Sequence, residues 1–405
     1  MRYIVDWHIH SKFSRACSKQ LELPVIDEWC KRKGIDVVAT GDWTHPAWFK
    51  HIKDSLEEKR QGVYQLKGGG ACEFMLVQEI SQIYKKGDKT RRIHNLVFSP
   101  SIETCEEVVA ELKRRKFNLR SDGRPILGVD SEDFYKMLKE IDEKIIIIPA
   151  HAWTPWYAIF GSKSGFDSIQ ECFGSMGKYI YAIETGLSSD PAMNWRLSSL
   201  DDVLLVSNSD AHSPRNLGRE ANVFEFDEPP TYDEFVRVLR EKDTSKFKYT
   251  IEFHPEEGKY HLDGCSNCKF SCLPEESKKL EGRCPGCKRL LTLGVHHRIE
   301  ELADRDSASV ASRKIPYKSI VPLAEIIAEV VGVKSTQSKK VLAEYFRLTN
   351  DVANEFTLLL DTPIDQIKKV ATDPRLAEAI RRMRAGEMNI SPGYDGIFGS
   401  VKIFQ

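Results

Sequence analysis

The sequence lacks the features that would place a chain outside the ordinary globular class. No apolar run approaches the roughly 20 residues of a membrane-spanning helix, and there is no low-complexity tract. The formal net charge is only −1, so overall charge does not indicate a nucleic-acid partner. The chain enters an apolar, strand-like run at once, which predicts that it has no signal peptide. We therefore expect no membrane partner and a cytoplasmic location, at the nucleoid if the source is prokaryotic.

Disulfides are a further absence that we expect, because a cytoplasmic location keeps thiols reduced. Four of the ten cysteines form two pairs, Cys265-x2-Cys268 and Cys284-x2-Cys287, separated by fifteen residues. This spacing is typical of a zinc ion held by four thiolates, with no position open for chemistry. We predict a structural zinc site in a small module, which either touches nucleic acid or acts only as a staple. Cys272 is left over.

Histidines and carboxylates recur just after, within or at the ends of short apolar runs in the first half of the chain. They are His8, His10, Asp42, Glu79, His94, His151, Asp210 and His212. Strand-like runs alternate with helical segments here, and the strand ends of a parallel barrel meet on one face. His8 and His10 are two residues apart, as are Asp210 and His212, so each pair points to one side of its strand. We predict that all eight residues are ligands of a multinuclear metal site.

The residue types also indicate the chemistry. Five of the eight are imidazoles, which favours zinc or manganese over magnesium, and we expect two or three divalent ions. Such ions polarise a phosphate ester and turn water into a nucleophile near neutral pH. Glu79 is the best bridging candidate because a carboxylate has two oxygens, and we assign catalysis to Glu79, Asp210, His8 and His10. His45 is a candidate ligand, orienting residue or phosphate contact.

The chain divides into three expected parts. Residues 1–255 read as an α/β, distorted TIM-like barrel with about seven strands, residues 256–300 as the four-cysteine zinc module, and residues 301–405 as a helical DNA-binding or docking domain with a glycine-rich tail. The tail is expected to be loosely ordered. Three basic clusters, at residues 85–92, 113–116 and 381–384, are each a solvated face by themselves, but together on one side of a cleft they would form a phosphate track.

A glycine- and aromatic-rich segment begins directly after His151. Its candidate substrate-binding residues are Trp156, Phe160, Ser162, Lys163 and Phe166. Such a composition at the end of a ligand-bearing strand is typical of a binding loop. The alternative, that its aromatic rings simply pack on the barrel rim, is left open.

Six motifs carry a family resemblance. They are Asp6-Trp7-His8-Ile9-His10, Thr40-Gly41-Asp42, Val77-Gln78-Glu79-Ile80, Ile93-His94-Asn95-Leu96, Pro149-Ala150-His151 and Ser209-Asp210-Ala211-His212. Over residues 1 to about 225 the chain resembles the polymerase and histidinol phosphatase (PHP) family, whose members are distorted (β/α)7 barrels with up to three metals. The resemblance implies that His8, His10, Glu79 and Asp210 hold one ion, Glu79, His94 and His151 a second, and that Asp42 and His212 contribute to a third. Where many relatives have an acid or a histidine after the first pair, this chain has Ala16 and Cys17.

The order of PHP barrel, four-cysteine module and helical tail, together with the loop at 159–167, is similar to the endonuclease Q family. That resemblance implies an endonuclease that nicks damaged double- or single-stranded DNA 5′ to uracil, hypoxanthine, xanthine or an abasic site, and leaves 3′-hydroxyl and 5′-phosphate ends. The damaged base would be extruded into a pocket, with Trp156, Phe160 and Phe166 stacked beside it. A replication clamp is a further possible partner that the sequence leaves open, because residues 401–405 are too short to be identified as a clamp-binding peptide. The alternatives are a phosphoesterase acting on a small phosphorylated metabolite and a DNA-binding scaffold without catalysis.

Overall fold

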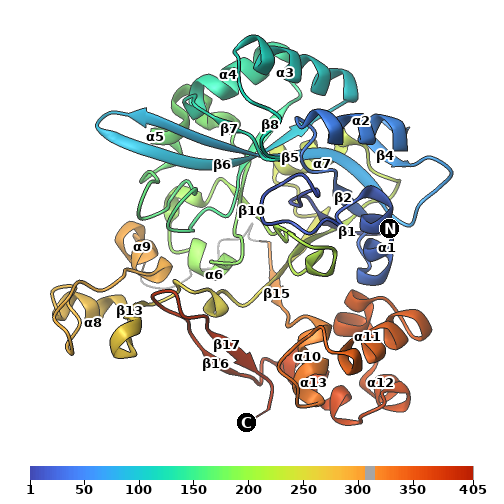
Figure 1. Cartoon of the computed structure of the whole chain (residues 1–405), viewed down its shortest axis with the longest axis vertical. Helices are drawn as coiled ribbons and strands as arrows, with labels where there is room; N and C mark the ends of the chain where they lie inside the picture. Colours follow the sequence, from blue (N-terminus) through green and yellow to red (C-terminus); the bar gives the residue numbers. More distant parts are fainter. Residues whose placement is uncertain (306–314, 405) are drawn as a thin grey trace.

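The computed structural model describes residues 1–305 and 315–404. Figure 1 shows a strand-rich part at the top, the four-cysteine module at the lower left and a lobe of helices at the lower right. Within the described ranges, no helix is both long and apolar enough to cross a membrane. The metal-ligand candidates all belong to the strand-rich part.

The predicted apolar runs form strands, most of them short and buried. They are β1 (Arg2–Asp6), β2 (Val37–Ala39), β5 (Glu73–Lys86), β6 (Lys89–Ser99), β8 (Ile146–Pro149), β9 (Ala182–Glu184) and β10 (Leu204–Val206). β1, β2 and β5 pair in parallel, as do β9 and β10. A parallel bridge between Ile9 and Ala211 joins the segments that follow β1 and β10, which brings two distant ligand pairs side by side.

Helices connect several of these strands, as the alternation predicts. They are α1 (Leu23–Lys33), α2 (Pro46–Ser55), α3 (Ile102–Arg114), α4 (Ser131–Ile141) and α7 (Tyr232–Glu241). α1 has a proline in its first turn and Gly34 at its C-cap at φ 86°, which are the residues typical of a helix start and end. In the core, the Trp7 ring packs edge-on against Phe98 and Phe235 at 5.4 and 5.5 Å.

The strands are not all parallel, so the prediction of a parallel barrel is only partly correct. β6 runs antiparallel to both β5 and β8. The reason is local, because only Gly87 and Asp88 separate β5 from β6 and so short a turn allows only a hairpin. The basic cluster at residues 85–92 forms the tip of this hairpin. The β5–β6 hairpin is called the ribbon below.

The remaining parts pack through strands as well as helices. The cysteine module contains β13 (Asp263–Cys265), β14 (Phe270–Cys272), α8 (Pro274–Lys279) and α9 (Val295–Leu302), and the helical lobe contains α10 (Leu323–Val330), α11 (Lys339–Asp351), α12 (Ile364–Val370) and α13 (Arg375–Ala385). Ahead of that lobe, β15 (Tyr317–Ser319) pairs with β12 (Phe247–Glu252), which in turn pairs with β11 (Ala221–Glu225) beside β1. The C-terminal segment is thus joined directly to the sheet that carries the first histidine pair.

The glycine-rich tail is ordered, contrary to the prediction. It forms a hairpin of β16 (Asn389–Ser391) and β17 (Ser400–Lys402) that runs between the module and the helical lobe (Figure 1). Its turn is held by hydrogen bonds to Asp395 from Ser266 and Thr292 of the module. Ile403 is buried, and its backbone N–H donates to Glu329. These contacts disagree with a free clamp-binding peptide at residues 401–405.

Candidate metal centre

Four side chains from three distant segments bring their donor atoms together, three of them just past a strand end and one within a long strand. His8 and His10 follow β1, Glu79 lies in β5 and Asp210 follows β10, and one donor atom of each lies within 4.8 Å of the others. His10 Nε2 is 3.2 Å from Asp210 Oδ1 and 3.4 Å from Glu79 Oε2. His8 Nε2 is buried without a hydrogen-bond partner. Because a buried ring nitrogen is rarely left unsatisfied, this set of donors fits a bound cation.

Glu79 belongs at the same time to a second group of donors. Its Oε1 lies 2.5 Å from His94 Nδ1 and 3.0 Å from His151 Nε2, whereas Oε2 faces His10 of the first group. These three side chains form a second cluster with donor atoms within 4.8 Å of each other. A fully buried carboxylate with one oxygen toward each group has the geometry to bridge two cations.

The charges in this pocket also suit cations. Burial would raise the pKa of Glu79, but His94, Arg124 and His8 together hold that pKa well below its usual value. Burial likewise opposes ionisation of Asp210, yet the charge of His8 lowers the pKa of Asp210. Burial lowers the pKa of His94 to about 4, so its ring is neutral and can offer a lone pair. Burial would lower the pKa of His8, His10 and His151 as well, but the surrounding carboxylates raise it, so a zinc or manganese ion bound there would displace protons from these rings.

Asp42 and His212, expected at a third ion, lie outside both groups. Asp42 Oδ2 accepts hydrogen bonds from the Ser11 backbone N–H, the Ser11 hydroxyl and the Ser14 hydroxyl at 2.7, 2.6 and 2.8 Å. Its Oδ1 is 3.3 Å from His10 Nδ1. Three of these contacts are to Oδ2 and one is to Oδ1, so Asp42 orients His10, and its contribution to a third ion stays a prediction. The His212 ring lies 4.7 Å from the His10 ring and is 31% exposed.

Glu184, at the end of β9, is part of the site although the sequence interpretation omitted it. Its carboxylate lies 3.0 Å from His8 Nδ1 and accepts hydrogen bonds from the His151 backbone N–H at 2.7 Å and from Asn208 Nδ2 at 2.9 Å. It therefore orients His8 and fixes the backbone of His151. The signal was present, because Glu184 directly follows an apolar run in the same way as the predicted ligands.

Two further residues of the site do not follow an apolar run, so the sequence pattern could not identify them. Arg124 Nη1 lies 2.7 Å from Glu79 Oε2, which places a guanidinium at the shared carboxylate. The Tyr157 ring lies 4.6 Å from the His94 ring, and the Tyr157 carbonyl accepts a hydrogen bond from the His94 backbone N–H at 3.0 Å. Both come from loops, whose positions are set by tertiary contacts that a single sequence does not reveal.

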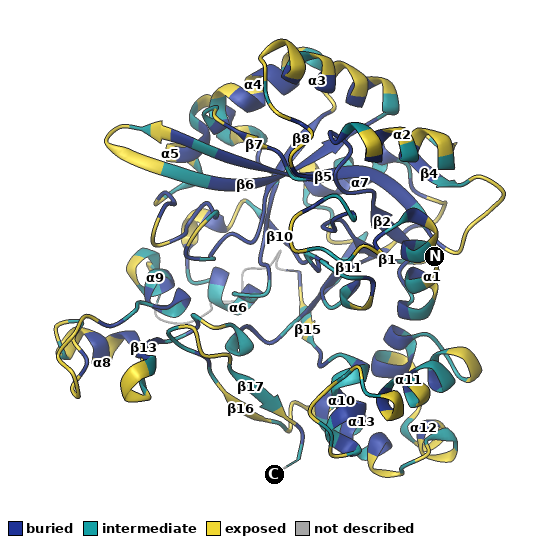
Figure 2. Cartoon of the chain, viewed as in Figure 1, coloured by how far each residue is buried: buried dark blue, intermediate teal, exposed yellow. Residues whose placement is uncertain are grey.

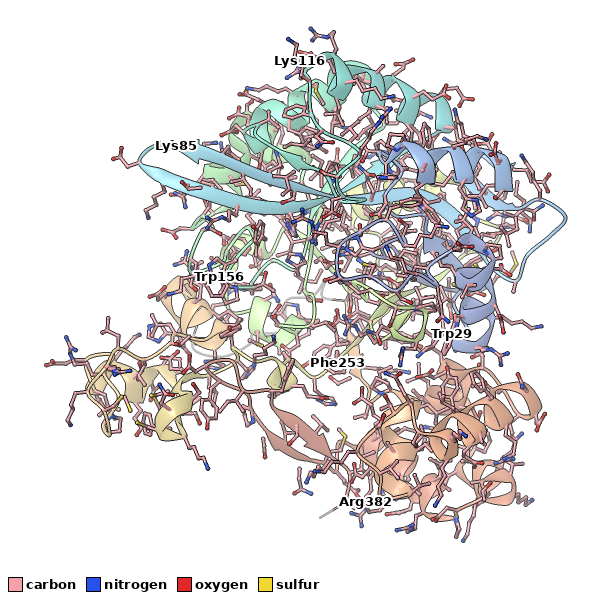
Figure 3. All side chains as sticks on the ribbon, viewed as in Figure 1. Trp29, Lys85, Lys116, Trp156, Phe253 and Arg382 are labelled. Carbon is pink, nitrogen blue, oxygen red and sulfur yellow. The ribbon has the colours of Figure 1, made fainter. Side chains whose placement is uncertain are left out.

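The loop after His151 presents fewer rings than predicted. Phe160 and Phe166 are 1% and 2% exposed, so neither offers a free face to an extruded base, and their assignment as stacking residues is wrong in this conformation. They are apolar side chains that pack inward, which is the alternative left open above. Trp156, labelled in Figure 3, is 41% exposed. Ser162 and Lys163 are exposed as well.

This loop is held from two sides by arginines. Arg298, on α9 beside the cysteine module, donates hydrogen bonds to the carbonyls of Phe160 and Phe166 at 3.1 and 3.2 Å and pairs with Asp167. From β6, Arg91 lies over the Phe166 ring at 4.0 Å and donates to the Gly165 carbonyl. The loop therefore depends on α9 for its position.

His45 lies apart from both donor groups. Its ring stacks on Phe13 with ring centroids 4.3 Å apart, and burial lowers its pKa. Its Nδ1 is buried without a partner. His45 is therefore not positioned as a ligand of either donor group. A contact between His45 and a phosphate remains a prediction.

The four paired cysteines also gather at one point. Cys265, Cys268, Cys284 and Cys287 offer sulfur atoms within 4.8 Å of one another, and the sulfurs of Cys265 and Cys287 are 3.8 Å apart. Zn–S bonds of about 2.3 Å in a tetrahedron require sulfurs about 3.8 Å apart, so the spacing fits zinc. Cys272 stays outside the group.

Three candidate ligands have a backbone conformation that is unusual for side-chain-bearing residues. Asp42, His151 and Asp210 have φ angles of 42°, 29° and 47°. Beside His151, a Cβ at Gly186 would lie 2.6 Å from the histidine Cβ, so the glycine makes room for the bend. Left-handed residues at strand ends turn these side chains back toward the cluster.

Comparisons with known proteins agree with this architecture. Residues 322–387 match the family described as MJ0043 C-terminal domain, and residues 202–244 match one described as PHP-associated. A crystal structure of the novel lesion-specific endonuclease PfuEndoQ from Pyrococcus furiosus superposes with a TM-score of 0.87 at 33% identity, covering 99% of this chain and 95% of that one. Endonuclease Q in complex with a 27-mer duplex substrate with an abasic lesion at the active site gives a TM-score of 0.86, also at 33% identity, covering 100% and 97%. The uncharacterized protein MJ0043 of Methanocaldococcus jannaschii is 31% identical over 318 residues, which are 73% of this chain but only 39% of that protein.

Proposed function

Because the chain belongs to the endonuclease Q family, we propose that it is a metal-dependent endodeoxyribonuclease that nicks DNA on the 5′ side of a damaged nucleotide. The lesions would be uracil, hypoxanthine, xanthine and abasic sites, and the products 3′-hydroxyl and 5′-phosphate ends. One observation carries the proposal: two donor groups share Glu79 in a chain that is 33% identical, over its whole length, to an endonuclease Q solved with an abasic duplex.

The proposed chemistry assigns a task to each part of the centre. Divalent cations at the two groups would neutralise charge on the scissile phosphate and lower the pKa of the attacking water. His8, His10 and Asp210 would hold one cation, His94 and His151 the other, with Glu79 between them. Arg124 adds positive charge where a phosphate would approach.

Residues 1–255 are the proposed catalytic part, residues 256–300 the zinc module and residues 301–405 the DNA-binding or docking part. Trp156, Ser162 and Lys163 are the proposed contacts to the damaged nucleotide, because they are exposed on the loop that leaves His151. Tyr157 joins them, since its ring is partly exposed and lies against His94. Aromatic rings beside a metal centre can stack on an extruded base.

The proposal is tested with end-labelled duplexes that contain one deoxyuridine, one abasic site or no lesion, each incubated with zinc, manganese or magnesium. We expect a nick 5′ to the lesion, none in the intact duplex, and none with Asp210→Ala. Phosphate release from small esters without nicking would instead identify a metabolite phosphoesterase. A gel shift without cleavage under every metal would indicate a DNA-binding scaffold.

A further inference from the structure

The ribbon extends far beyond the strands that flank it, and its outer half has no role in the centre described above. Figure 1 shows it projecting from the strand-rich part, and in Figure 2 its inner end is buried whereas its tip is exposed. The antiparallel pairing runs from Leu76 and Ser99 to Lys86 and Lys89 without a shift in register. The alternation of side chains is therefore unbroken from the metal centre to the tip.

One face of the ribbon continues the metal centre outward. In an antiparallel pair, opposite residues point to the same face, and that face recurs every second residue. Glu79 and His94 share a face, since their side chains are in contact. Along the same face come Arg92, opposite Ile83, and then Lys85, opposite Thr90. These outer residues define the open face.

The other face of the ribbon is covered by the protein. The hydroxyls of Tyr84 and of Ser131 in α4 share a hydrogen bond at 3.0 Å, and Lys86 forms an ion pair with Asp130 at 3.1 Å. Arg91 lies against Phe166. Lys86 and Arg91 on this face therefore serve the fold, whereas Lys89 at its outer end is exposed.

The cations of the open face have no such partners. Within residues 1–305 and 315–404, neither Lys85 nor Arg92 has a side-chain hydrogen bond or an ion pair. Ile126, 53% exposed, pairs with Ser81 and so lies on the same side, and Arg124 stands at the root of the ribbon beside Glu79. A cationic strip with an exposed apolar side chain, starting at a phosphodiester-cleaving centre, is complementary to a sugar–phosphate chain.

The other two basic clusters do not join this strip. Figure 3 places Lys85 on the ribbon, Lys116 at the upper end of the molecule and Arg382 at the lower end. Arg114 pairs with Glu111 of its own helix, and Arg382 pairs with Glu378. A single phosphate track through all three clusters, as considered from the sequence, is therefore wrong.

We propose that the open face binds the backbone of one DNA strand in the duplex beside the lesion, an inference that rests on the proposed nuclease function. At about 3.4 Å per residue, Arg92 lies about 7 Å and the Lys85–Thr90 pair about 14 Å from His94 along the strand. Since a DNA strand carries one phosphate per 3.4 Å of helix axis, the strip reaches about four base pairs from the cut. The ribbon thus sets how much intact duplex is needed on one side of the lesion.

The experiment compares the full chain with the double variant Lys85→Gln, Arg92→Gln and with Lys89→Gln as a matched control. Lys89 is an exposed lysine at the same tip, but it lies opposite Lys86 and therefore on the other face. Dissociation constants are measured between 50 and 200 mM salt on an abasic duplex with a non-hydrolysable linkage 5′ to the lesion. Each duplex flank is then shortened in turn to three base pairs.

We expect the double variant to flatten the slope of log affinity against log salt by about 1.8, which is about 0.9 for each phosphate that the variant no longer neutralises. This makes the loss of affinity between 50 and 200 mM salt about 12-fold smaller than in the unchanged chain. Shortening one flank, and not the other, should abolish the difference in salt dependence between the double variant and the unchanged chain. The inference would be overturned if the double variant kept the slope of the unchanged chain, or if Lys89→Gln changed the slope as much as the double variant does. It would also be overturned if shortening either flank left the effect of the double variant unchanged. If the unchanged chain binds with the expected slopes but nicks no lesion, the proposed function fails while the DNA surface stands.

Discussion

Replacing Glu184 with glutamine should weaken cation binding without unfolding the protein. The buried carboxylate faces three donors, on His8 Nδ1, the His151 backbone N–H and Asn208 Nδ2. Glutamine keeps the shape, but its NH2 group would face one of these donors and leave it unpaired, at a cost of about 1–3 kcal/mol. Removal of a carboxylate behind a ligating histidine lowers metal affinity by about 10–100-fold, or about 1.4–2.7 kcal/mol.

The measurement is the zinc or manganese concentration that gives half-maximal nicking of an abasic duplex, together with calorimetric metal binding. Glu252→Gln is the matched control, because burial raises the pKa of Glu252 to about 8 and glutamine resembles the neutral acid present at pH 7. Glu252 bonds to Thr185 and Thr250 and not to a ligand histidine. We expect the midpoint to rise 10–100-fold only for Glu184→Gln. Equal midpoints in that variant and the unchanged chain, at equal thermal stability, would refute the role given to Glu184.

Three other outcomes follow from the contacts described above, and a fourth from the burial of Asp190, the N-cap residue of α6 (Pro191–Asn194). Arg298→Ala should speed hydrogen exchange in residues 158–166 and lower kcat/KM on lesions, with partial rescue by Arg298→Lys; unchanged exchange would show that the loop does not need α9. Phe160→Ala should cost about 3–5 kcal/mol of unfolding free energy, whereas Trp156→Ala should spare stability and weaken lesion binding; the reverse result in denaturant titration and binding assays would contradict their placement. Burial raises the pKa of Asp190 from 3.8 to about 6, so the native state binds more protons between those values and its stability falls as pH rises through them. Asp190→Asn should therefore raise the melting temperature at pH 8 by an amount worth at most about 3 kcal/mol, and leave it unchanged at pH 3. Cys284→Ser should release zinc, detected by metal analysis, and weaken DNA binding while the melting of the barrel persists; full zinc content would contradict the assignment.

The sequence predicted those parts of the site that depend on strand periodicity. His8 and His151 follow strand ends and Glu79 lies within β5, and all three could be placed because apolar runs and their limits are local properties of the chain. The same rule would have found Glu184 if it had been applied to the run before it. The hydrogen bonds that occupy Asp42 could not be predicted, since they depend on which serines of a neighbouring loop fold over it.

The inward packing of Phe160 also depends on contacts between segments that are distant in the sequence. A loop rich in rings and glycines can expose them or bury them, and the choice depends on Arg298, 138 positions further along the chain. The pairing sense of β6 was in principle readable, because its two-residue turn with β5 excludes a crossover. Local sequence patterns therefore predicted the helices and strands, whereas contacts between distant segments determined how strands pair and which side chains are exposed.

The left-handed backbone at Asp42, His151 and Asp210 implies a conflict between durability and catalysis. A side-chain-bearing residue pays about 1 kcal/mol or more to hold such a conformation, and glycine at the same place would relieve it. Laboratory selection for heat resistance alone should thus drift toward glycine at these bends, and each such step would remove a side chain of the proposed metal centre or of its surroundings. The chain is therefore somewhat less stable than its scaffold allows, and that loss of stability is concentrated beside the proposed metal centre.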